Sequence, residues 1–335
     1  MVSFASWSVL TVDFLIILYL ALGGVTLAAL LHLVNAKWRF DVRFLTVSFF
    51  SLYPLAFVLL LILLWGGKMT FPWVGSTESM PFWNNLTFLS VREILGFIVV
   101  GVLFGTFIKL QAVAERDPES KGAFRNVALL IPFAYVLFGT MVAWDFEMTQ
   151  LPNWESSIYA MYFFVSNFGM FLSFTATLVY FLNSSGALSK PIGDYIYNYF
   201  AQIMLAFTIL WVYTFFAQYL VIWYGNLPEE TDRIFHMQNG YYGTLFWTFF
   251  VMKFVFPFVM LVFPFNRHNP ASILVVAASI MVGTWIERYT WISGTYSSPH
   301  MPMTSLFDIG VTAIVFGVAF ILVRMTMKKY KLIKA

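Results

Sequence analysis

The residues of this sequence that could do chemistry are ionisable side chains placed within or at the ends of long apolar stretches. Charge inside a membrane is costly, so such residues are functional candidates by default. In the first half of the chain, carboxylates and a guanidinium could surround a small cavity, bind a polar head group and accept protons from it. The alternative is that most of them lie at the interface, where charge costs little. These candidates are Asp13, Arg92, Glu93, Asp145 and Glu147.

Lys253 stands near the middle of an apolar stretch in the second half of the chain. Its i−4 and i+4 neighbours, Phe249 and Pro257, cannot neutralise it, so an acidic partner on another helix is required. Among the carboxylates within apolar stretches, Glu287 lies at the depth in the membrane closest to that of Lys253, so it is the expected partner. The pair could belong to a proton path or could lock two helices together, and both readings stay open. The proton-path candidates are Lys253, Glu287, Arg288 and His32, although His32 also fits an interface residue.

The chain has no cysteine, which excludes a cysteine-ligated iron–sulfur cluster, a thiolate zinc site and a disulfide within it. A transmembrane haem commonly needs paired histidines, and of the four histidines only His32 falls inside an apolar stretch. We therefore expect no haem, no iron–sulfur cluster and no metal in this chain. Its basic residues lie at helix ends, so no nucleic-acid partner is expected.

Composition indicates the elements that position these residues. Hydrophobic residues make up 60% of the chain and charged residues 10%, far below the share that covers a soluble protein. The apolar blocks are long enough to cross a hydrocarbon core, where the backbone must form helices. The sequence predicts an all-α polytopic membrane protein with nine transmembrane helices. The predicted spans are Trp7–Val34, Phe44–Gly66, Val91–Ala112, Asn126–Asp145, Ser157–Asn183, Tyr195–Trp223, Tyr241–Phe265, Ala271–Thr290 and Leu306–Met327.

The distribution of positive charge predicts an orientation. Most of the 19 Lys and Arg residues fall in the first, third, fifth and seventh loops and in the C-terminal tail. Cytoplasmic loops carry the excess of Lys and Arg, so we expect an outer, periplasmic N-terminus and a cytoplasmic C-terminus. The first candidate group then lies toward the outer side.

A weak internal repeat suggests how the spans are grouped. Asn126 and Asn269 open spans four and eight, and a Gly-Thr pair follows about four turns later in each, at Gly139 and Gly283. Chance could also produce this match. Four spans per repeat predict a first four-helix bundle at 1–150, a second at 151–300, and a C-terminal peripheral helix with a basic tail at 301–335.

Three segments together resemble a known family. Trp211–Thr231, reading WVYTFFAQYLVIWYGNLPEET, is similar to a signature of the membrane quinone-binding subunits of alternative complex III. Trp144–Tyr159, reading WDFEMTQLPNWESSIY, resembles a second signature, and Phe82–Arg92, reading FWNNLTFLSVR, resembles the stretch before a span in the same subunits. These subunits belong to the polysulfide reductase NrfD-like family. The chain looks closer to the smaller, ActF-type subunit of this quinol:cytochrome c oxidoreductase.

The resemblance implies an integral subunit of a respiratory or photosynthetic quinol:cytochrome c, or other acceptor, oxidoreductase in a bacterial inner membrane. It implies quinol as a possible ligand, with a site toward the outer side of the first bundle, among the five residues singled out there. Proton conduction through the bundles would give Lys253 and Glu287 a role. The implied partners are iron–sulfur and multihaem cytochrome c subunits on the outer side, a second NrfD-like subunit and membrane lipids. With no redox ligand here, electrons would leave through a partner.

The sequence departs from the family pattern in ways that keep alternatives open. Relatives usually have ten spans, and Leu151 replaces an expected acidic residue in the second signature. The chain is therefore also read as a scaffold and proton-path subunit without its own quinol site. A third hypothesis is a secondary transporter, which predicts interrupted helices and a polar midplane pocket.

Overall fold

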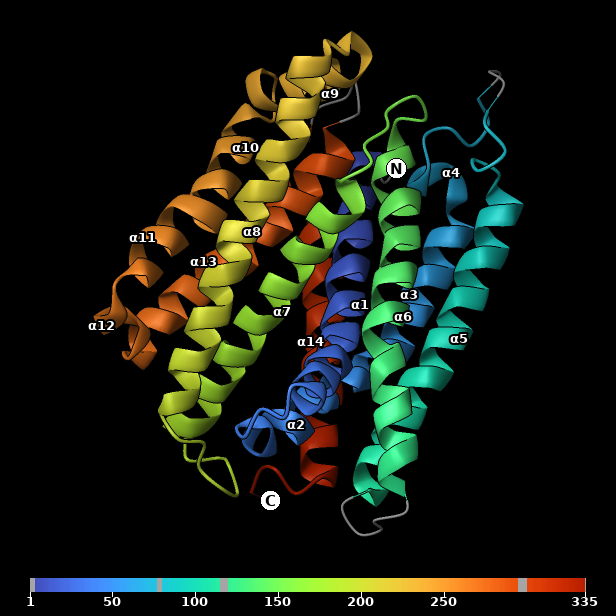
Figure 1. The fold of residues 1–335 in the computed structure, drawn as a ribbon. Helices are drawn as coiled ribbons and strands as arrows, with labels where there is room; N and C mark the ends of the chain where they lie inside the picture. Colours follow the sequence, from blue (N-terminus) through green and yellow to red (C-terminus); the bar gives the residue numbers. More distant parts are fainter. Residues whose placement is uncertain (1–3, 77–79, 115–119, 295–299, 335) are drawn as a thin grey trace.

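The chain is built almost entirely of helices, and its two ends lie at opposite ends of the molecule (Figure 1). The computed structural model describes residues 4–76, 80–114, 120–294 and 300–334. Within these residues no strand forms, and an isolated bridge joins Leu188 to Ile333. The helices are α1 (Phe4–Leu33), α2 (Arg39–Ser48), η1 (Phe49–Leu52), α3 (Tyr53–Trp65), α4 (Gly67–Thr70), α5 (Leu86–Val113), α6 (Lys121–Phe146), η3 (Met148–Gln150), α7 (Tyr159–Ser184), α8 (Tyr195–Gly225), α9 (Pro228–Asn239), α10 (Gly243–Phe250), η4 (Val251–Val255), α11 (Phe256–Val262), α12 (Pro264–Arg267), α13 (Pro270–Ser293) and α14 (Leu306–Lys329).

Nine helical segments of the described residues are long and apolar enough to cross a membrane, which confirms the predicted fold class. The second is made of α2, η1 and α3, and the seventh of α10, η4 and α11. The chain is therefore a multi-pass membrane protein. The segments are Trp7–Leu33, Arg39–Trp65, Leu86–Val113, Lys121–Gln150, Tyr159–Ser184, Tyr195–Gly225, Gly243–Val262, Pro270–Ser293 and Leu306–Lys329.

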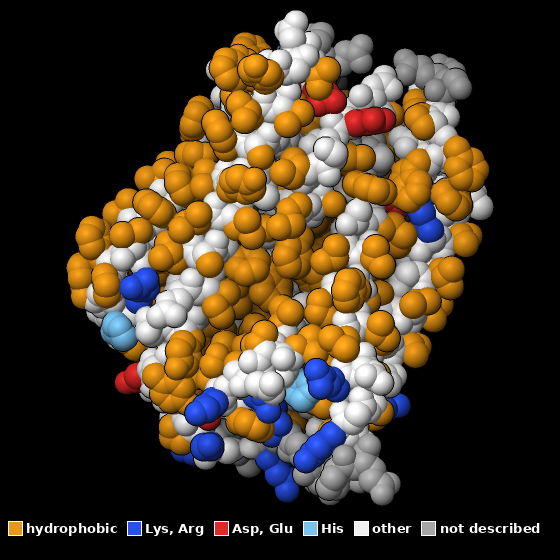
Figure 2. All heavy atoms as spheres, viewed as in Figure 1, with side chains coloured by type: hydrophobic (Ala, Val, Ile, Leu, Met, Phe, Trp, Pro, Cys, Tyr) orange, Lys and Arg blue, Asp and Glu red, His pale blue; other side chains and the backbone are white. Residues whose placement is uncertain are grey.

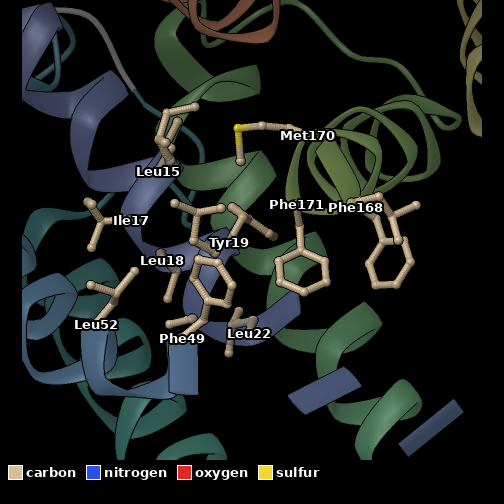
Figure 3. Packing of buried hydrophobic residues seen from close by; sticks show 14 of the residues in the cluster. Leu15, Ile17, Leu18, Tyr19, Leu22, Phe49, Leu52, Phe168, Met170 and Phe171 are labelled. Carbon is tan, nitrogen blue, oxygen red and sulfur yellow. The ribbon is translucent and has the colours of Figure 1, made fainter. Parts of the chain in front are cut away.

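The first helix is the centre of the packing. In the most apolar part of α1, 94% of the residues are buried, against 22% for the last helix, α14. It contacts α2, η1, α3, α6, α7, α13 and α14. Figure 3 shows Leu18, Tyr19 and Leu22 of α1 beside Phe49 of η1 and Phe171 of α7. A helix that is apolar on every face is suited to such a core.

The other helices pack in two groups around α1 (Figure 1). On one side α6 contacts α5, and α5 contacts α3; on the other α7 contacts α8 and α13, and α13 contacts α10. The two groups meet because α6 also contacts α7, while α14 lies against α1 and η1. α1 and α6 contact helices of both groups. The predicted division of the chain into two four-helix bundles, with boundaries at residues 150 and 300, therefore stays a prediction.

Some helices begin before the predicted boundaries. The second and fourth spans start at Arg39 and Lys121, whose long apolar stems let a helix continue past the hydrocarbon while the charge reaches water. The helix α5 starts early because Asn85 caps it: its Oδ1 accepts a hydrogen bond of 3.0 Å from the backbone N–H of Phe88. A segment expected to be loop forms α9.

The two ends of the molecule differ in charge. Lys and Arg side chains gather at one end, which we call the basic end, and an apolar belt separates them from the acidic side chains visible toward the other (Figure 2). The basic end also holds the C-terminal tail. We call the other end the α9 end, since α9, α4 and the start of α1 lie there (Figure 1).

Close packing of α1 against α2 requires a glycine. A Cβ atom on Gly24 would lie 2.1 Å from the backbone oxygen of Thr46, whereas a Cβ on Gly105 of α5 would meet nothing within 4 Å. We expect Gly24→Ala to lower the midpoint of thermal unfolding, because a backbone carbonyl must move. The matched control Gly105→Ala should leave it unchanged or raise it, since Ala favours a helix over Gly by about 1 kcal/mol. Thermal unfolding in detergent measures both, and equal midpoints for the two variants would contradict the inferred contact.

Candidate functional site

Two carboxylates flank Phe146, the last residue of α6, and they face opposite ways. Asp145 points toward α5, where it pairs with Arg92. Glu147 points toward α7 and α13, where it pairs with Arg288. Successive helical residues turn by about 100°, so side chains two positions apart leave a helix on nearly opposite sides. One helix end therefore supplies a carboxylate to each of two buried clusters.

The first cluster, which we call the Arg92 cluster, comprises Trp83, Arg92, Glu93 and Asp145. The Nε and Nη2 atoms of Arg92 donate to the two oxygens of Asp145 at 2.8 and 2.5 Å, the two-pronged geometry that suits a guanidinium and a carboxylate. The Nε1 of Trp83 donates to Asp145 at 2.7 Å, and Arg92 lies over the Trp83 ring at 4.0 Å. Asp145 is fully buried, so it is neutralised within the protein.

Glu93 is the incompletely satisfied member of this cluster. Its side chain is fully buried beside Asp145 and Arg92, yet neither carboxylate oxygen accepts a hydrogen bond from a described residue. With Arg92 as its neighbouring cation, two ionised carboxylates would leave one buried charge uncompensated. A proton on Glu93 would remove that charge and let Glu93 donate to Asp145. The cluster therefore has one carboxylate more than its cation can balance.

The second cluster, which we call the Lys253 network, comprises Glu147, Lys253, Glu287 and Arg288. The Nη1 of Arg288 lies 2.6 Å from Glu147, and its Nη2 lies 3.2 Å from Glu287. Glu287 also pairs with Lys253, which confirms the partner predicted for that lysine. Two carboxylates and two cations balance one another, as buried charge requires.

Hydroxyl and indole groups complete the network. Glu287 accepts hydrogen bonds from Tyr162, from Ser166 at 2.5 Å and from Trp211 at 2.8 Å. The Nζ of Lys253 donates to the Ser166 hydroxyl at 2.5 Å, which places that hydroxyl between the lysine and the carboxylate. At the other carboxylate, Tyr159 donates to Glu147 at 2.5 Å.

A distortion of the seventh span sets the position of Lys253. The segment η4 is a π-helix that contains Lys253, between α10 and α11. Such single-turn bulges insert an extra residue into a helix and often occur at functional sites. The neighbouring α13 approaches closely at Gly283, where a Cβ atom would lie 2.7 Å from Cγ of Lys253. The lysine is therefore held by backbone shape as well as by charge.

Arg233 of α9 links the network to the α9 end. Its side chain is 3% exposed, and it donates to the backbone oxygens of Glu147 and Trp291, each at 2.9 Å. It also lies over the rings of Trp154 and Trp291 at 4.5 and 5.0 Å. The buried polar groups thus extend from a helix at the α9 end to Lys253 near the middle of a span.

Tyr19 of α1 lies between the two clusters. Its hydroxyl donates to the backbone oxygen of Gly139 at 3.1 Å, and it interacts electrostatically with Glu93, Glu147 and Arg288. The central helix therefore places one hydroxyl near charged groups of both clusters.

The remaining candidates are held elsewhere. The oxygens of Asp13 accept hydrogen bonds from Trp285 at 2.9 Å and from Thr312 at 2.7 Å, which ties α1 to α13 and α14. His32 lies at the basic end of α1, with its ring 4.4 Å from that of Phe124. The structure therefore does not gather the five candidates of the first half around one cavity, and it places His32 apart from Lys253.

Several members of these clusters escaped sequence reasoning. Trp83, Tyr159 and Trp211 lie inside the three quoted segments, which was a usable signal. Arg233 follows one of those segments by two positions, but hydropathy assigned it to a loop. Among the described residues, no three His, Cys, Asp or Glu side chains form a set that could hold a metal ion.

No protein-family model matches this chain, and no curated protein matches it.

The charge balance of the Lys253 network predicts an order of stability. Glu287→Gln leaves Lys253 and Arg288 with one carboxylate, so we expect it to lower the free energy of unfolding by about 3–5 kcal/mol. Lys253→Met should lower the free energy of unfolding by less, because Glu287 is still neutralised by Arg288. The double variant should be more stable than Glu287→Gln alone, since it removes the unbalanced charge. Denaturant or thermal unfolding checks the order, and a double variant less stable than Glu287→Gln would contradict it.

Proposed function

We propose that this chain is a membrane subunit of a quinol-oxidising electron-transfer complex of the alternative complex III type, and that it transfers protons through the Lys253 network. The observation that carries the proposal is the continuous set of buried ionisable groups and hydroxyls from Glu147 to Lys253. The three quoted segments support the family, and the network supports this role within it.

The network divides into mobile and fixed charges. Arg288 keeps its proton, since a guanidinium is not deprotonated in proteins. Lys253, Ser166 and Glu287 can exchange a proton along existing hydrogen bonds: Lys253 gives a proton to the Ser166 oxygen as that hydroxyl gives its own to Glu287. The fixed charge of Arg288 contacts both Glu287 and Glu147, so protonation of one carboxylate changes the field at the other.

Placement in a membrane gives this transfer a direction. With positive charge inside, the basic end faces the cytoplasm of a bacterial inner membrane and the α9 end faces outward. Iron–sulfur and multihaem cytochrome c subunits would bind at the α9 end, and a second NrfD-like subunit beside this chain. Quinol oxidation releases protons at the outer side, where the network begins with Glu147 and Arg233.

Quinol binding at the Arg92 cluster is the second candidate role. The buried Glu93 carboxyl, which accepts no hydrogen bond from a described residue, favours it because a quinol hydroxyl could donate there. Asp145 is already occupied by Arg92 and Trp83, which limits it to orienting these groups.

Glu287→Gln in the intact complex, reconstituted in vesicles, tests the proposed role. We expect proton transfer across the membrane to slow by about a hundredfold, because a positioned acid–base group is lost. Quinol oxidation with an uncoupler present should continue at the parent rate. A pH-sensitive dye and cytochrome c reduction measure the two.

The matched control is Asp41→Asn, which removes an exposed ion pair with Lys190 at the basic end. Unchanged proton transfer in assembled Glu287→Gln complex would contradict the proton role. Slower quinol oxidation in Glu93→Gln would favour the second role. Solute transport by the chain reconstituted alone would instead favour a transporter.

A further inference from the structure

A cavity of about 660 Å³ lies at the basic end, apart from both clusters. It forms where the end of α1 and the start of α2 face the end of α5 and the start of α6. Its volume is within the range of small-molecule sites and exceeds what an inorganic ion would fill. The described residues that line it include Arg39, Phe40, Arg43, Gln111, Lys121 and Arg125.

Positive charge converges on this cavity from two separate helices. Arg39 and Arg43 come from α2, whereas Lys121 and Arg125 come from α6. No acidic side chain is among the described residues that line it. Asp41 of α2 is engaged elsewhere, since it accepts a hydrogen bond of 2.6 Å from Tyr195 and pairs with Lys190. An anion is attracted to cations arranged in this way.

Gln111 provides an independent sign of a ligand. Its side chain is 4% exposed and lines the cavity, and its Oε1 atom is buried without a hydrogen-bond partner among the described residues. Leaving such a group unsatisfied is unfavourable, so buried amides normally have partners. An amide can donate to a phosphate oxygen or accept from a hydroxyl, and a ligand with both groups would satisfy it.

The remaining lining defines the shape of the ligand. Phe40, Phe124 and Leu33 give the cavity apolar walls, and Arg39 and Arg43 each lie 4.7 Å from the Phe40 ring. Both guanidinium groups therefore contact the same ring. Guanidinium groups bind phosphate with two parallel hydrogen bonds, which favours phosphate over a simple halide.

We propose that this cavity binds a phosphate-bearing molecule through Arg39, Lys121 and Arg125, with Gln111 bound to its polar linker. Two sources share this chemistry. One is the headgroup of an anionic phospholipid, since basic pockets between transmembrane helices bind such headgroups. The other is a soluble phosphorylated compound that enters from the same side.

The test uses the full chain in nanodiscs of phosphatidylcholine alone or with cardiolipin, and inorganic pyrophosphate as the soluble probe. Arg39→Gln with Arg125→Gln is the main variant, and Lys190→Gln, at the basic end outside the cavity, is the control. Each lost charge-assisted hydrogen bond weakens binding by about tenfold or more. Native mass spectrometry counts retained cardiolipin, and thermal unfolding reports stabilisation by either probe.

Cardiolipin retention that the arginine variant loses and the control keeps supports the lipid source. Stabilisation by pyrophosphate in phosphatidylcholine nanodiscs, lost in the same variant, supports the soluble source. If neither probe binds in a way that depends on the cavity arginines, the proposal is overturned.

Gln111→Leu keeps the test decisive if the arginine variant does not fold. The change removes a buried unsatisfied amide, so the ligand-free protein should become more stable, while cardiolipin, whose glycerol hydroxyl can donate to Oε1, should bind more weakly. A purely structural glutamine would not move these two readouts in opposite directions. Lower stability together with unchanged probe binding would overturn the role of Gln111 and of the cavity.

Discussion

Charge buried in a low-dielectric interior must be balanced by opposite charge within reach, and much of this fold follows from that constraint. Glu147, Glu287, Arg288 and Lys253 come from three different spans, so none of these spans can pack without the others. The helices at the α9 end are therefore joined by mutual neutralisation rather than by apolar contact alone. Between helices in lipid the hydrophobic effect is weak, which makes such polar contacts correspondingly important.

The central helix supports this arrangement from within. α1 is mostly apolar, and two of its polar side chains, Asp13 and Tyr19, contact different neighbours. Gly23 and Gly24 let α7 and α2 approach its backbone.

The features of this structure that depend on one segment at a time can be predicted from the sequence. The nine spans follow from apolar length, and the partner of Lys253 follows because its own helix offers none. The burial of α1 could not be predicted, since apolar residues that face lipid and those that face protein look alike. Tyr162 and Ser166 could not be predicted either, because a hydroxyl in a span stands out only when its partner is known. The spacing of Asp145 and Glu147 already predicts that they point in opposite directions. The hypothesis of one common cavity did not take this into account.

The start of α9 shows a second limit. Pro228 at its first turn is a helix-start signal, but the segment is too polar to register as a span. Hydropathy is sensitive to what enters lipid and not to what lies on top of it, and Arg233 was missed for that reason.

The carboxylates on either side of Phe146 join the end of α6 to two different ion pairs. Since both carboxylates belong to one helix end, the position of that end sets the Asp145–Arg92 and Glu147–Arg288 contacts together. Each cluster therefore holds a helix end that the other cluster also holds. Phe146, between these two carboxylates, packs against Phe14 and Phe71 at centroid distances of 5.0 and 5.5 Å, and these contacts hold the helix end in place.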